Sequence, residues 1–78
     1  MFCKEKQKKV TINLHNYENA IEFIDITNSS FAEFDIQQNQ VFVDGKSMLG
    51  VLSLDLSKKM ILIIIGEFDV EKIKKWKV

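Results

Sequence analysis

The stretch KSMLGVLSL, residues 46–54, decides how the rest of the chain is interpreted. It follows a breaker pair, Asp44-Gly45, and its apolar residues recur at the spacing of a short amphipathic helix. Ser47 stands where a side-chain oxygen accepts a free backbone N–H at the start of a helix. The pattern predicts a helix with Ser47 as its N-cap, although Gly50 inside it costs about 1 kcal/mol relative to alanine.

The segments after this helix predict one strand and one further helix. The unbroken aliphatic run MILIII, residues 60–65, is short and rich in β-branched side chains, which favours a buried strand over a helix. We expect it to be the central strand of a sheet. Asp69 can then cap a last helix. That helix carries one apolar stripe, formed by Val70, Ile73 and Trp76.

The segments before residue 46 predict three strands and a helix. Period-two alternation over residues 8–13 indicates a half-buried strand. From Tyr17 the apolar spacing becomes helical, with Asn16 in the N-cap position and an end near residues 28–30. Two short apolar alternations follow, around residues 34–36 and 41–43, and a polar turn at 38–40 joins them into a hairpin.

The resulting order is strand, helix, strand, strand, helix, strand, helix. This order predicts an α+β fold of the open-faced β-sandwich type, a four-stranded antiparallel sheet with three helices on one face. The chain of 78 residues is long enough for one hydrophobic core, so we expect a single domain over residues 1–78. Its 46% hydrophobic and 28% charged residues are typical of a folded domain with an ordinary charged surface.

Charge and cysteine content exclude several classes of function. Eleven lysines balance eleven acidic residues, so no net field attracts nucleic acid or an anionic membrane. The longest apolar run, residues 60–65, is far shorter than the ~20 residues of a membrane span, and the N-terminus lacks the apolar core of a signal peptide. Cys3 is the only cysteine, which excludes an internal disulfide and favours the cytoplasm. We expect no metal site and no cofactor.

The order of elements and the stretch 46–54 together resemble the HPr family, the histidine-containing phosphocarriers of the bacterial sugar phosphotransferase system. The second helix of that family carries Lys-Ser-Ile-Met-Gly-Leu-Leu-Ser-Leu, close to KSMLGVLSL here. Residues 10–12 fit the family's first strand, and Phe31 fits the aromatic residue after its first helix. The resemblance implies an HPr-like fold in a bacterial, cytoplasmic protein.

The family's phosphohistidine motif is missing from the matching stretch. In HPr proteins a phosphoryl group from phosphoenolpyruvate passes through a histidine at the start of helix one, within Gly-x-His-Ala-Arg-Pro-Ala. Aligned without gaps on the first strand, the positions of histidine, arginine and proline hold Tyr17, Asn19 and Ala20. Glu18 adds a negative charge that opposes a phosphate there. The resemblance therefore implies a degenerate member that is no enzyme and at most a phosphoryl carrier.

His15 leaves one alternative open. Leu14-His15 copies a residue pair of the family's active site, and a two-residue deletion in the preceding loop would align it with the phosphohistidine. The other interpretation is a surface histidine in the loop before an N-cap. An active phosphocarrier that uses His15 is thus the alternative to a regulatory or protein-interaction module.

The second helix carries the contact residues that the resemblance implies. In HPr proteins of many Gram-positive bacteria a kinase phosphorylates the serine that matches Ser47, which here could equally serve only as an N-cap. Met48, Leu49 and Leu52 fall in the apolar patch by which the family docks onto phosphotransferase proteins and a transcriptional regulator. Their alternative role is core packing.

The strand 60–65 suggests a third function, self-assembly. In the family register Leu62 and Ile64 point toward the helices, which places Ile61, Ile63 and Ile65 on the open face of the sheet. An exposed row of isoleucines would favour a homodimer, and the chain would then be an orphan structural domain. Alternatively, long neighbouring side chains cover the row, namely Lys9, Glu33 and Gln37.

Overall fold

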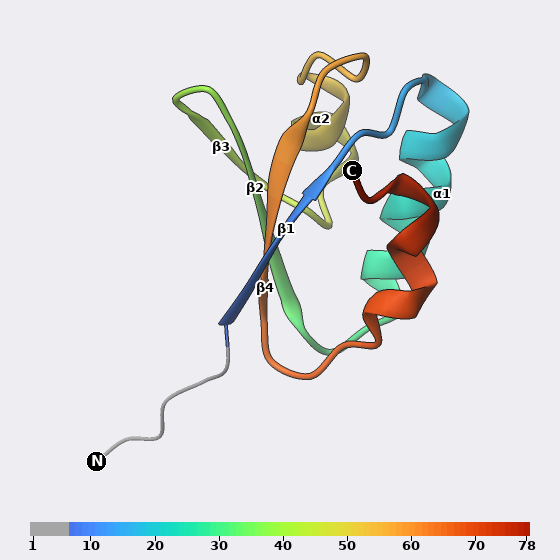
Figure 1. The fold of residues 1–78 in the computed structure, drawn as a ribbon, viewed down its shortest axis with the longest axis vertical. Coiled ribbons are helices and arrows are strands. Elements are labelled where there is room, and N and C mark those ends of the chain that lie inside the picture. The colour runs from blue at the N-terminus through green and yellow to red at the C-terminus, as the bar shows by residue number, and fades with distance from the viewer. Residues whose placement is uncertain (1–6) are drawn as a thin grey trace.

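The computed structural model describes residues 7–78, so Cys3 lies outside the described residues. Strands and helices follow one another in the predicted order (Figure 1). The elements are β1 (Gln7–Ile12), α1 (Tyr17–Asn28), β2 (Glu33–Gln38), β3 (Val41–Asp44), α2 (Met48–Leu52), β4 (Met60–Ile65) and the 3₁₀ helix η1 (Val70–Trp76).

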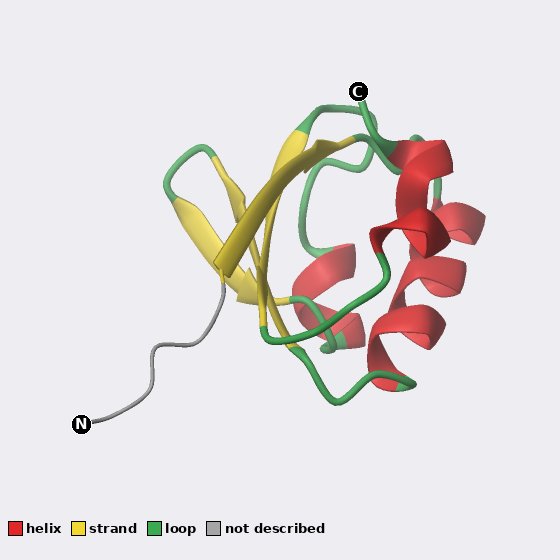
Figure 2. Cartoon of the chain, turned by 60° about the horizontal axis from the view of Figure 1, so that its bottom comes forward, coloured by secondary structure: helices red, strands yellow, loops and turns green. Residues whose placement is uncertain are grey.

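The sheet has the strand order β1-β4-β2-β3, and every neighbouring pair is antiparallel. β4 lies between β1 and β2, which confirms the prediction of a central strand for residues 60–65. Helices cover one face of the sheet and leave the other open (Figure 2). The α+β open-faced sandwich is therefore confirmed. Within residues 7–78 no helix is long and apolar enough to cross a membrane.

The register of the strands decides which side chains enter the core. Leu62 pairs with Val10 on β1 and with Ile36 on β2, and residues paired across a sheet share one face. Leu62 and Ile36 are both fully buried beneath the helices. Ile64, two residues further along β4, is buried on the same side. Leu62 and Ile64 thus point toward the helices as predicted.

The first helix begins and ends as the sequence predicts. The Asn16 side chain accepts a hydrogen bond from the backbone N–H of Asn19 (2.9 Å), and the helix ends at Asn28. Its buried stripe runs along one side at helical spacing and consists of Ala20, Phe23, Ile24 and Thr27. The ring of Phe23 meets Trp76 of η1 edge-on at 6.0 Å between centroids, which packs η1 against α1.

The other two helices differ in detail from the prediction. α2 ends at Leu52, so the last two residues of the stretch 46–54 lie beyond the helix. The Gln38 side chain bonds both the N–H and the carbonyl of Asp55 (2.8 and 2.9 Å) and draws this segment toward β2. The last helix is a 3₁₀ helix capped by Asp69. The apolar residues Val70, Ile73 and Trp76 recur every three residues, which matches the three residues per turn of a 3₁₀ helix.

Candidate functional site

Hydrogen bonds join the end of α1 to the residues that precede α2. The Thr27 hydroxyl donates to the Gly45 carbonyl (2.9 Å), and the Asn28 amide donates to the Lys46 carbonyl (2.9 Å). The Lys46 ammonium in turn donates to the carbonyl of Ser30 (2.8 Å). These contacts hold the start of α2 at the C-terminal end of α1. Sequence reasoning missed Thr27, which stands at an apolar position of the helical pattern and is fully buried.

The loop before α1 is held instead by the segment that follows α2. The backbone N–H of His15 donates to the Leu56 carbonyl (2.8 Å) and to the side-chain oxygen of Asn13 (3.0 Å). The Asn13 amide donates to the Ser57 carbonyl (3.3 Å). His15 therefore lies at one end of α1 and Ser47 near the other, so the two predicted phosphate-bearing residues belong to separate places.

A turn formed by Asp55 and Ser57 orders the segment that hydrogen-bonds the His15 loop. The Asp55 carboxylate accepts hydrogen bonds from the hydroxyl (2.7 Å) and the backbone N–H (3.1 Å) of Ser57. These two bonds lower the pKa of Asp55 from its ordinary value. The spacing Asp-x-Ser is a turn signal that sequence reasoning missed.

His15 is exposed and has an unusual backbone conformation, with φ of 73°. The left-handed region is uncommon for a residue with a β-carbon. Asn16, not His15, caps the helix, and it engages the N–H of Asn19 at the helix start. The Asn19 amide is itself bonded to the Leu14 carbonyl (2.8 Å).

The first turn of α1 contains no cationic side chain. The residue at its start, Tyr17, is 60% exposed, and the carboxylate of Glu18 follows it. A phosphate there would have backbone N–H groups and the weak field of the helix end, worth about 0.3–1 kcal/mol for an exposed charge. Among residues 7–78 no group of histidine, cysteine and acidic side chains could hold a metal ion.

Ser47 caps α2 as predicted. Its hydroxyl oxygen accepts the N–H of Gly50 (3.1 Å), and the residue is partly exposed. A β-carbon on Gly50 would lie 3.1 Å from the Val43 β-carbon and 3.4 Å from the Ser47 hydroxyl. Gly50 therefore lets the first turn of α2 approach β3 closely, which explains a glycine that lowers helix propensity.

The three apolar residues predicted for docking have different environments. Leu49 is 85% exposed and Met48 is 48% exposed, both in the first turn of α2. Leu52 is half-buried and packs against the core. The alternative of core packing thus applies to Leu52, whereas Met48 and Leu49 present apolar surface to solvent. Docking through them stays a prediction.

The isoleucine row on β4 is less exposed than expected. Ile63 retains only 8% exposure on the open face of the sheet, and Ile65 is half-buried. Lys9 and Asp35 flank Ile63 from the neighbouring strands. The prediction of a continuous exposed row is therefore wrong for Ile63, and Ile61 at 36% is its most open member. Self-association through this face stays a prediction.

Comparison with known proteins gives structural matches alone. No described protein family matches the sequence, and no curated protein sequence matches it. The fold is similar to the crystal structure of a phosphocarrier protein HPr from Bacillus anthracis str. Ames, with a TM-score of 0.66 and 28% identity over 91% of this chain and 89% of that one. It is also similar to HPr-C-His from Thermoanaerobacter tengcongensis, with a TM-score of 0.62 and 26% identity over 86% and 83% of the two chains. The chain therefore has an HPr-like fold and is related to the HPr phosphocarrier proteins.

Proposed function

We propose that this chain is a degenerate HPr-like protein that acts in the bacterial cytoplasm as a regulatory or protein-interaction module of the sugar phosphotransferase system, without histidine phosphocarrier activity. The observation that carries the proposal is the start of α1. Asn16 occupies the cap, and Tyr17, Glu18 and Asn19 supply neither an imidazole nor a guanidinium in the first turn. The chain keeps the fold, but it lacks the imidazole that accepts the phosphoryl group and the guanidinium that stabilises it.

The exposure of His15 supports a second candidate, an active phosphocarrier. Its side chain precedes the cap of α1 and is accessible to a phosphoryl donor. Against this role, all eleven basic residues are lysines, so no guanidinium can grip the phosphate with two parallel bonds. The phosphotransfer measurement at the end of the Discussion separates the two candidates.

Ser47 supports regulation by phosphorylation. It is partly exposed, and its hydroxyl only accepts a hydrogen bond from Gly50, so the oxygen remains open to modification. A phosphate at a helix start is electrostatically favoured. Treatment with ATP and the kinase that modifies HPr proteins should label the chain on serine, and Ser47→Ala should abolish the label. Unlabelled wild type under conditions that modify a true HPr would refute this site.

The first turn of α2 is the contact surface that the proposal requires. We expect Leu49→Asp to weaken binding to the purified phosphotransferase proteins and transcriptional regulator of the same genome by at least tenfold, about 1.4 kcal/mol, because it places a charge in an apolar contact. Titration calorimetry measures the change.

Val41→Asp is the matched control, since Val41 is an apolar residue of β3 that is 51% exposed. It should bind as the wild type does. The proposal fails if none of these proteins binds the wild type, or if Val41→Asp weakens binding as much as Leu49→Asp.

A further inference from the structure

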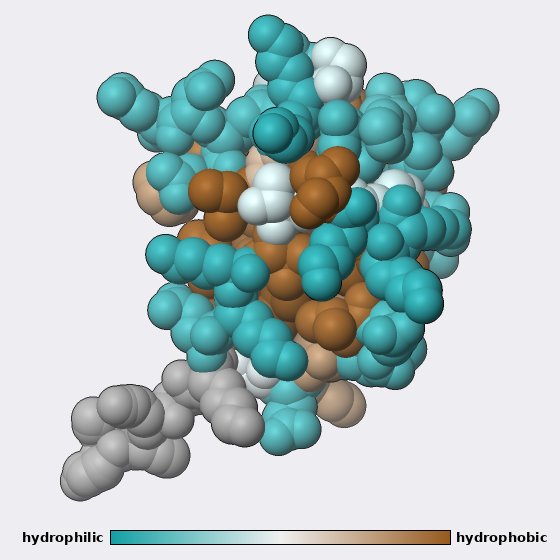
Figure 3. All heavy atoms as spheres, in the orientation of Figure 1, coloured by the Kyte–Doolittle hydropathy of each residue, from teal (hydrophilic) through white to brown (hydrophobic). Residues whose placement is uncertain are grey.

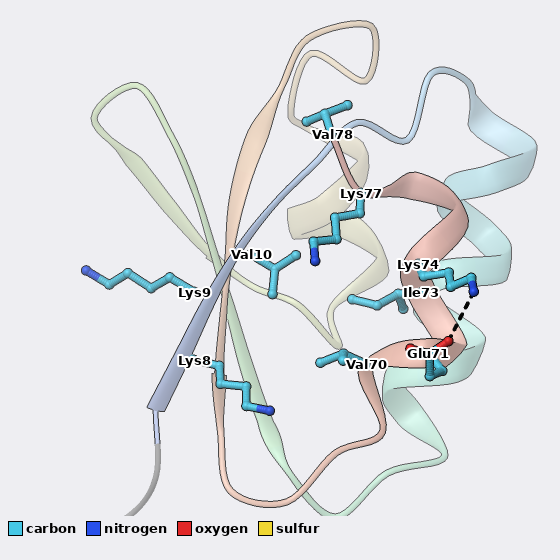
Figure 4. A pocket seen from close by; sticks show the side chains of 9 residues that line it. All are labelled: Lys8, Lys9, Val10, Val70, Glu71, Ile73, Lys74, Lys77 and Val78. Carbon is cyan, nitrogen blue, oxygen red and sulfur yellow. Dashed lines mark ion pairs between the residues drawn. The ribbon is translucent and has the colours of Figure 1, made fainter.

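A groove of about 650 Å³ lies between β1 and η1, on the helix-bearing side of the molecule (Figure 4). Its lining is apolar in the middle and cationic around it. The apolar residues are Val10, Val70, Ile73 and Val78, and the charged residues are Lys8, Lys9, Lys74, Lys77 and Glu71. The space-filling view shows the same division, with hydrophobic surface in the centre of this face and hydrophilic side chains around it (Figure 3).

The lysines around the groove have distinct orientations. Lys8 and Lys77 extend toward the groove, whereas Lys9 points to the opposite side of β1 (Figure 4). Glu71, the one acidic residue of the lining, is paired with Lys74 at 3.3 Å. Lys8, Lys9 and Lys77 therefore place positive charge near the edge of β1, and no acidic side chain other than Glu71 lines the groove.

β1 forms one edge of the sheet, and the end of the chain already pairs with part of that edge. Lys77 forms an antiparallel bridge with Ile12, and the N–H of Val78 donates to the Thr11 carbonyl (3.0 Å). The N–H of Asn13 donates to the Trp76 carbonyl (2.8 Å). The outer side of β1 is therefore competent to pair with an extended segment.

The same geometry turns the backbone N–H and carbonyl of Lys9 toward the outer side of β1. In an antiparallel ladder the N–H and carbonyl of one residue point to the same side, and successive residues alternate. Because the Thr11 carbonyl points outward to Val78, the N–H and carbonyl of Lys9 point outward as well. Among residues 7–78 they have no backbone partner beyond the sheet.

We propose that this edge binds an extended peptide segment of a partner protein, in which acidic and apolar residues alternate, as an additional strand beside β1. Side chains of an added strand alternate between the two faces of the sheet. Its apolar residues would enter the groove over Val10 and Ile73, and its carboxylates would meet Lys9 on the open face. This mode of recognition takes its affinity from backbone hydrogen bonds and its specificity from the alternating side chains.

Charge explains why the partner is acidic and why β1 is the edge that is used. The other edge strand, β3, carries Asp44, which pairs directly with Asp35 of β2. An acidic strand would be repelled there and attracted to the lysines of β1. The groove shares no residue with the first turn of α2, so the inference goes beyond the proposed function and does not depend on it.

The test uses the ¹⁵N-labelled chain and the synthetic peptide Ac-Glu-Val-Glu-Val-Glu-Val-NH₂. We expect NMR shift changes confined to β1, η1 and Lys77–Val78, with hydrogen exchange of the Lys9 amide slowed at least tenfold. Raising the salt concentration should weaken binding. The inference is overturned if the peptide does not bind at millimolar concentration, or if the shifts map to β3 or α2.

Two controls separate strand pairing from charge alone. A peptide N-methylated on the residues that face β1 keeps its side chains and loses its hydrogen-bond donors, so its affinity should fall at least tenfold. The substitution Lys9→Glu should have a similar effect, because it places a carboxylate beside those of the peptide. Lys59→Glu, in the loop before β4, should bind within threefold of the wild type. Equal binding by the N-methylated peptide would contradict an added strand.

Discussion

Replacing Trp76 with alanine is expected to lower the free energy of unfolding by about 3–5 kcal/mol. The indole is 2% exposed and meets the ring of Phe23 edge-on, so it joins η1 to α1 through a buried aromatic contact. Lys75 reinforces the same junction through its ion pair with Glu22 (2.6 Å), but that pair is half-exposed and contributes little. Small domains are stable by only roughly 5–15 kcal/mol, so this variant should be marginal.

Urea titration measures the loss of stability. Unfolding is followed by far-UV circular dichroism, because the substitution removes the only tryptophan of the chain and with it the tryptophan fluorescence signal. Trp76→Phe is the matched control. It keeps an aromatic ring against Phe23 and should lose less than half as much stability as Trp76→Ala. A loss below about 1 kcal/mol for Trp76→Ala would show that η1 does not depend on this contact and would contradict the packing described here.

The second large effect is expected at Gly45, where alanine should cost about 1–3 kcal/mol. A β-carbon there would lie 2.7 Å from the Phe34 β-carbon and 3.2 Å from the Phe34 carbonyl oxygen. The Phe34 carbonyl oxygen and β-carbon are fixed by the backbone, so they cannot move away as the end of a flexible side chain can. The Gly45 N–H donates to that same carbonyl (2.7 Å), and the Gly45 carbonyl accepts the Thr27 hydroxyl, so any shift disturbs both bonds.

Gly50→Ala is the control for this prediction. Its new β-carbon would be 3.1 Å from a single side-chain atom of Val43, and helix propensity gains about 1 kcal/mol in return. Urea titration followed by the fluorescence of Trp76 should therefore give a smaller loss for Gly50→Ala than for Gly45→Ala. The reverse order would mean that the turn before α2 has more room than the structure shows.

Local sequence signals predicted most of the fold because each acts over a few residues. Asn16, Ser47 and Asp69 accept backbone N–H groups at the three helix starts as their side-chain chemistry predicts. The aliphatic run 60–65 forms a strand with a neighbour on each side. A strand in the interior of a sheet can bury a continuous run of apolar side chains, which is why the run predicted this position. The apolar stripe of the last helix was recognised, but its 3₁₀ form was not predicted, although a spacing of three residues matches that geometry.

Features that depend on distant contacts could not be predicted in the same way. The Gln38 side chain of β2 bonds the backbone of Asp55 in the segment that follows α2, and no local signal predicts that contact. Ile63 is buried on the open sheet face between Lys9, which the sequence alternative named, and Asp35, which only the strand register identifies. The groove beside β1 was missed for the same reason, since its two walls come from opposite ends of the chain.

The candidate site was predicted in part. Ser47 as a cap follows from the pattern of residues 46–54. The exposure of Met48 and Leu49 was implied only by the family resemblance, because the helical pattern alone left core packing open. The left-handed backbone of His15 and its hydrogen bond to Leu56 could not be predicted from the sequence, because they result from the packing of two loops.

Incubation of the full chain with phosphoenolpyruvate and the first enzyme of the phosphotransferase system tests the central claim most directly. An authentic HPr serves as the positive control, and intact-mass spectrometry at neutral pH measures the phosphorylated fraction. The account predicts that the chain gains no phosphoryl group under conditions that fully modify the control. An acid-labile phosphate on His15, absent from His15→Ala, would contradict it and make the chain a working phosphocarrier.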